Sequence, residues 1–128
     1  MDGKNGVDLV IGSKDGAKQG DLAAPFGWLE SPPNPRDLAA WTWHPMIDVG
    51  WTMGIETADM DGDGDEDIVI TDRYGNHTGC RWLENDGSAT WKQHDIGAIG
   101  ENCMFFSLAD LDGDGLQDVS VVTMGNKL

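Results

Sequence analysis

An acidic, glycine-punctuated segment that occurs twice constrains the fold of this chain more than any other feature of its sequence. The first copy, residues 59–67, reads DMDGDGDED, and the second, residues 110–118, reads DLDGDGLQD. Acidic residues occupy the first, third, fifth and ninth positions of both copies, and glycine occupies the sixth. A repeat with a period of about 50 residues predicts a fold of similar units that stack or radiate from a centre.

The carboxylates of each copy are spaced as the ligands of one calcium ion. Calcium takes roughly 6–8 oxygen ligands in a flexible geometry, and without an ion so many carboxylates in one loop would repel each other. The seventh residue would add its backbone carbonyl, and the glycine before it would supply a turn with positive φ. We therefore predict two Ca²⁺ ions per chain, with the ligands Asp59, Asp61, Asp63, Asp65 and Asp67 in the first loop and Asp110, Asp112, Asp114, Leu116 and Asp118 in the second.

Two alternative interpretations of the loops can be weighed on the residues alone. An EF-hand loop needs a Glu at position 12 and flanking helices, whereas position 12 is Ile70 or Val121 here and short β-branched runs follow both loops. A solvated acidic turn that binds nothing is the other alternative, and the identical spacing of two loops argues against it. A degraded third copy begins at Asp2, but Lys4 occupies one of its ligand positions, so we predict no calcium there and expect Lys4 to pair with Asp2 and Asp8.

Other segments repeat in step with the loops. Trp-Leu-Glu recurs at residues 28–30 and 82–84, and Trp-x-x-His recurs at residues 41–44 and 91–94. Gly, Asn, Asp and Pro separate these segments, and helical periodicity is missing. Each complete unit therefore predicts four short strands, which is typical of a propeller blade.

These segments closely resemble FG-GAP/VCBS-type repeats, in which calcium-binding blades form propellers such as the heads of integrin α-subunits. The resemblance implies an all-β fold of four-stranded antiparallel blades in an incomplete ring, about two and a quarter blades per chain. We expect one partial propeller domain over residues 1–128. Its parts would be a first blade without its first strand (1–49), a complete second blade (50–99) and two strands of a third (100–128).

Length, charge and cysteine content limit the possible assemblies, partners and cellular locations of the protein. A propeller needs at least four blades, so 128 residues predict either a piece of a longer chain or a homo-oligomer. A net charge of −15 disfavours nucleic acid as a partner, and no stretch is long enough to span a membrane. Calcium loops of this kind favour a secreted or periplasmic location. Cys80 and Cys103 could pair there, but they occupy unrelated repeat positions, which favours two independent buried thiols.

Histidine and tryptophan are the remaining candidates for chemistry. His44 and His94 recur at one repeat position, which favours packing over catalysis, and we assign no catalytic residue. Trp43 and Trp51 do not repeat, so they are the candidates for ligand contact, with a core position as the alternative.

Two functional hypotheses follow. The first is a binding module for a protein or glycan, with calcium in a structural role. The second is a fragment of a carbohydrate-active propeller enzyme of the polysaccharide lyase or sugar dehydratase type, which the resemblance also admits.

Overall fold

Nine strands in three antiparallel sheets make up the part of the chain that the computed structural model describes, residues 3–14, 24–88 and 90–125. The first sheet has the order β1 (Leu9–Ile11), β2 (Ala24–Glu30), β3 (Thr42–Val49). The second has the order β4 (Thr52–Ala58), β5 (Asp67–Asp72), β6 (Gly79–Glu84), β7 (Lys92–Gly97). The third pairs β8 (Asn102–Ala109) with β9 (Asp118–Met124). In the connections that the structure describes there are two short 3₁₀ turns, η2 (Leu38–Ala40) and η3 (Gly75–His77).

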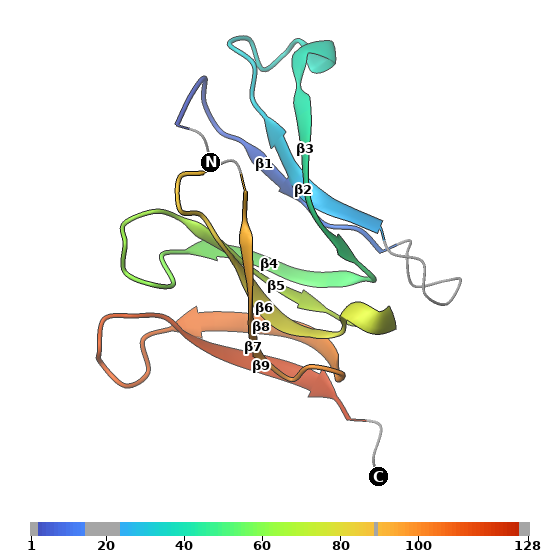
Figure 1. The fold of residues 1–128 in the computed structure, drawn as a ribbon, viewed down its shortest axis with the longest axis vertical. Coiled ribbons are helices and arrows are strands. Elements are labelled where there is room, and N and C mark those ends of the chain that lie inside the picture. Colours follow the sequence, from blue (N-terminus) through green and yellow to red (C-terminus); the bar gives the residue numbers. More distant parts are fainter. Residues whose placement is uncertain (1–2, 15–23, 89, 126–128) are drawn as a thin grey trace.

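The three sheets are stacked one on another, and each follows its predecessor along the chain (Figure 1). Within each sheet, consecutive strands are hydrogen-bonded neighbours. Among the described residues the stack is open, with three, four and two strands in successive sheets. This all-β arrangement of incomplete, propeller-like blades confirms the fold class that the sequence predicts.

The main hydrophobic core lies between the first and second sheets. Phe26 and Val49 come from the first sheet, and Ile68, Ile70 and Leu83 come from the second; all five are fully buried. All six residues of β5 are buried, because this strand is inside its sheet and the sheet has a neighbour on each face. Burying one such aliphatic or aromatic side chain contributes about 1.5–3 kcal/mol.

The second and third sheets pack closely where β4 and β5 face β8. A Cβ added at Gly54 would lie 2.7 Å from the ring of Phe106, so glycine at this position allows β8 to pack against β4. The Thr71 hydroxyl donates a hydrogen bond of 2.5 Å to the carbonyl of Met104.

Cys80 and Cys103 are free thiols and fully buried, which is the alternative that the sequence favours. Burial raises the pKa of Cys80 to about 11.

A buried carboxylate fixes the connection between the first and second sheets. Asp72 accepts hydrogen bonds from the amides of Gly50 at 2.6 Å and Trp51 at 2.7 Å. A Cβ at Gly50 would lie 1.8 Å from the carbonyl oxygen of Tyr74, so a larger residue cannot occupy this position without moving the backbone. This connection sets how the first blade sits on the second.

Candidate metal centre

Each acidic segment forms the tight loop between the first two strands of its blade. Residues 59–66 connect β4 to β5, and residues 110–117 connect β8 to β9. The two loops lie on the same side of the stack, at the left of the view in Figure 1. Strands rather than helices follow both loops, which confirms that neither is an EF-hand.

Side-chain to backbone hydrogen bonds shape the first loop. The Asp59 carboxylate accepts from the amide of Gly62 at 2.7 Å and from that of Gly64 at 3.0 Å. Asp61 accepts from the amide of Asp63 at 3.1 Å. Both glycines have positive φ, +80° and +96°, which confirms the predicted turn at Gly64.

The second loop has the same internal geometry. Asp110 accepts from the amides of Gly113 and Gly115 at 2.7 and 3.0 Å, and Asp112 accepts from Asp114 at 3.1 Å. The φ angles of its glycines are +82° and +95°. The sequence spacing therefore specifies one loop conformation twice, in two different sheets.

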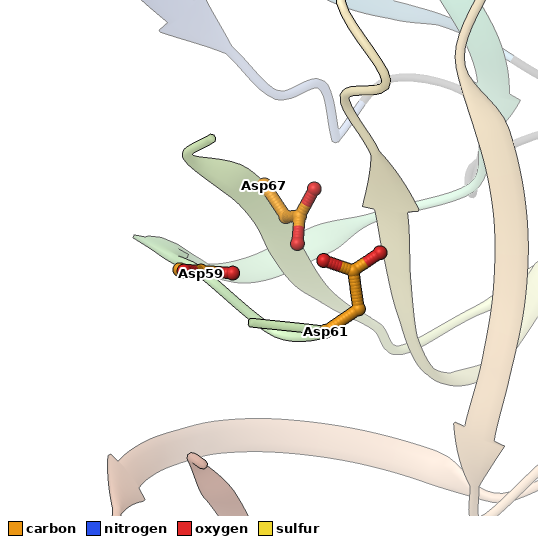
Figure 2. Close-up of side chains that lie close together, drawn as sticks. All are labelled: Asp59, Asp61 and Asp67. Atoms are coloured by element: carbon orange, nitrogen blue, oxygen red, sulfur yellow. The ribbon is translucent and has the colours of Figure 1, made fainter. Parts of the chain in front are cut away.

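Three carboxylates of each loop converge. Asp59, Asp61 and Asp67 each offer an oxygen within 4.8 Å of the others, and Asp110, Asp112 and Asp118 do the same. Figure 2 shows the first three side chains pointing toward one another, from the start of the loop, from the loop itself and from the start of β5. Oxygens that share one calcium ion lie at most about 5 Å apart, because each Ca–O distance is roughly 2.3–2.6 Å. An all-oxygen donor set at this separation fits a hard cation.

The other predicted ligands lie beside these groups. Asp63 and Asp114 are exposed, and each accepts a 2.8 Å hydrogen bond from the amide two residues further on, that of Asp65 or Leu116. Neither belongs to the three-carboxylate group of its loop. The carbonyl role of Asp65 and Leu116 stays a prediction.

The two centres differ in the burial of their last aspartate. Asp67 is 1% exposed and accepts hydrogen bonds from the amides of Met60 at 2.9 Å and Asn85 at 2.8 Å. Asp118 is more exposed and accepts from Leu111 at 2.9 Å.

Burial has an electrostatic consequence at the first centre. Desolvation raises the pKa of the Asp67 carboxyl, and the two backbone amides lower it. The charges of Asp61 and Asp63 raise it further. A divalent cation beside Asp67 would offset both the desolvation and the repulsion. The ionised carboxylates of the first loop would therefore be stabilised by a bound cation.

The degraded N-terminal copy keeps part of this framework. Asp8 accepts from the amide of Ser31 at 2.9 Å, and Asp67 accepts from the amide of Asn85 in the same way, so the contact occurs at the same repeat position in both copies. Asp2 lies outside the described residues, and its pairing with Lys4 stays a prediction.

The repeated histidines pack rather than stand free. The His44 ring stacks on Trp28 with centroids 4.3 Å apart, and the His94 ring stacks on Trp82 at 4.4 Å. The partners are cross-strand neighbours, not the tryptophans three residues earlier in the sequence. Nε2 of each histidine also contacts the carboxylate of a repeated glutamate. The distance is 2.9 Å from His44 to Glu30 and 2.6 Å from His94 to Glu84. Sequence reasoning missed this role, although both glutamates belong to the repeated Trp-Leu-Glu motif.

The two predicted ligand-contact tryptophans lie apart. Trp43 is 37% exposed on β3. Trp51 is half-buried between the sheets, tilted against Tyr74 with ring centroids 5.3 Å apart, and Arg73 lies over its ring at 5.5 Å. Trp51 also borders a small cleft of about 330 Å³.

Comparisons with known proteins add one finding. The family model described as an FG-GAP-like repeat matches residues 59–121, from the start of the first acidic loop into β9. No curated protein and no solved structure matches the chain. None of the helical segments in the described part of the chain is long and apolar enough to cross a membrane.

Proposed function

Because residues 59–121 belong to the FG-GAP-like repeat family, we propose that this propeller-type repeat module binds two calcium ions, one in each acidic loop. The observation that carries the proposal is the duplication of the site. Two loops in different sheets hold the same three converging carboxylates, with matching hydrogen-bond lengths. A solvated turn without a ligand gives no reason for this repetition.

The calcium ions would be structural. Each loop connects the first strand of a blade to the second, so an ion there would hold two strand ends together and screen the carboxylates from one another. Binding only to the folded state adds RT ln(1 + [Ca²⁺]/Kd) to stability, about 2.7 kcal/mol per site at 100 times Kd. The chain's own role would be to present oxygens at fixed positions, through the amide contacts that orient Asp59 and Asp67.

The module would serve binding of a protein or glycan in a secreted or periplasmic setting, within a homo-oligomer or a longer chain. Extracellular calcium modules have dissociation constants of about 10⁻⁴–10⁻³ M, which suits compartments where calcium is millimolar. The net charge of −15 supports a partner that is neutral or basic and disfavours nucleic acid.

Thermal unfolding with and without calcium tests the structural role. We expect the melting temperature of the wild-type protein to rise in millimolar calcium over EDTA. The double variant Asp63→Ala/Asp114→Ala should melt lower and show no calcium dependence. A wild-type melting curve that calcium leaves unchanged would refute the structural role of the ions.

A further inference from the structure

The Trp, Glu and His of the repeated motifs form the same cluster in two blades. In both, the imidazole stacks nearly parallel on the indole, at 15° in the first sheet and 18° in the second. In both, the imidazole Nε2 contacts a glutamate Oε2. The first cluster is Trp28, Glu30 and His44, and the second is Trp82, Glu84 and His94.

A lysine completes the second cluster. The Lys92 ammonium lies 2.8 Å from Oε1 of Glu84 and 3.2 Å from Oδ2 of Asp86. Lys92 is the cross-strand neighbour of Glu84. The carboxylate therefore contacts an imidazole on one oxygen and an ammonium on the other.

The first cluster has no lysine at that position. The cross-strand neighbour of Glu30 is Thr42, whose side chain is short and uncharged. The residue that aligns with Asp86 is Pro32. The side chain of Glu30 also stays 28% exposed, against 15% for Glu84.

Glu30 opens into a cleft between the first and second sheets. The cleft measures about 690 Å³, and Trp28, His44, Trp91 and Asp65 border it with Glu30. It thus combines two carboxylates with aromatic surfaces. Lys4 also borders the cleft, but it already has an interaction partner of its own.

We propose that this cleft binds the ammonium group of a lysine side chain from a protein partner, which takes at Glu30 the position that Lys92 takes at Glu84. A carboxylate accepts charge-assisted hydrogen bonds from an ammonium, and aromatic faces attract the same cation. The strongly acidic chain would steer a basic segment toward the cleft. The inference deepens the binding role proposed above. Glu30, which would make the ammonium contact, lies outside both acidic loops, so that contact does not require bound calcium.

NMR titration with a short peptide tests the proposal. The probe is acetyl-Gly-Lys-Gly-amide, added up to about 10 mM to the full chain in calcium and, separately, in EDTA. The lysine peptide should shift the indole N–H resonances of Trp28 and Trp91 in a saturable way. The same peptide with norleucine, which lacks only the ammonium, should not.

Three variants locate the site. Glu30→Gln should weaken peptide binding about five- to tenfold, the effect of replacing a charge-assisted hydrogen bond by a neutral one to the Gln carbonyl oxygen. Glu84→Gln, the matched control, should leave the affinity unchanged. Thr42→Lys should abolish binding, because it supplies an internal ammonium as Lys92 does in the next blade.

The outcomes separate this proposal from the calcium proposal. Saturable shifts that depend on Glu30 support the cleft even if calcium does not bind. Absence of shifts at 10 mM, equal weakening by the Glu30 and Glu84 variants, or equal binding of the norleucine peptide would overturn it. Shifts of the same resonances by neutral monosaccharides alone would assign the cleft to a glycan and also overturn it.

Discussion

Asp67 and Asp118 occupy the same position in the two loops but should differ in what they contribute to stability without calcium. Asp67 is buried and accepts two backbone hydrogen bonds, one of them from Asn85 in the connection after β6. Asp118 is more exposed and accepts one, within its own loop. The pair is therefore a matched test of how firmly each loop is built into its blade.

The expected magnitudes follow from those contacts. Replacing Asp67 by Ala leaves two amides without their acceptor, which costs about 1–3 kcal/mol each, and relief of the buried carboxylate offsets part of the loss. We expect a net loss of about 2–4 kcal/mol for Asp67→Ala and about 1 kcal/mol for Asp118→Ala, where water can replace the single contact.

Urea unfolding in EDTA, followed by tryptophan fluorescence, measures this difference. EDTA removes the contribution of any ion, so that only the loop framework is compared. Equal losses for the two variants, or a larger loss for Asp118→Ala, would refute the claim that Asp67 ties the first loop to the rest of its blade.

Three further predictions follow from the fold. Gly50→Ala should lower the free energy of unfolding by about 3 kcal/mol or more, because its Cβ would meet the Tyr74 carbonyl oxygen. Gly97→Ala, with open space around the added Cβ, should leave the free energy of unfolding nearly unchanged in the same urea assay. Burial raises the pKa of Cys80 to about 11, so the thiol of the unfolded chain ionises first as pH rises above about 9. The free energy of unfolding should therefore fall between about pH 9 and pH 11, and Cys80→Ala should remove that part of the pH dependence. Hydrogen bonds from Lys92 and His94 lower the pKa of Glu84. The contribution of Glu84 to stability is therefore present above its pKa in the unfolded chain and is lost as pH falls through its lower pKa in the folded chain. The urea midpoint of Glu84→Gln should depend less on pH in the acidic range than that of the wild-type protein.

Local sequence specified the loops well. The carboxylate spacing and the glycine at the sixth position determine a loop in which the hydrogen bonds of the first and third aspartates reach at most five residues along the chain, so both copies adopt it. The β-branched run after each loop likewise specifies a strand, and the strand numbers of the three sheets follow from the repeats.

Contacts between distant segments could not be read in the same way. The stack of His44 on Trp28 depends on the register of β2 with β3, which the linear spacing of Trp-x-x-His does not give. The contact of Asn85 with Asp67 joins the connection after β6 to the start of β5, and only the folded sheet brings them together. The difference in burial between the two loops depends on which sheet faces which, a property of the whole stack.

The calcium content of the folded chain tests the central claim most directly. Isothermal titration calorimetry of the calcium-free protein with CaCl₂ should give two ions per chain. Asp61→Asn and Asp112→Asn, which each remove one converging carboxylate, should each give one, and the double variant should give none. A wild-type protein that takes up no calcium at millimolar concentration, or a stoichiometry that these substitutions leave at two, would contradict the account.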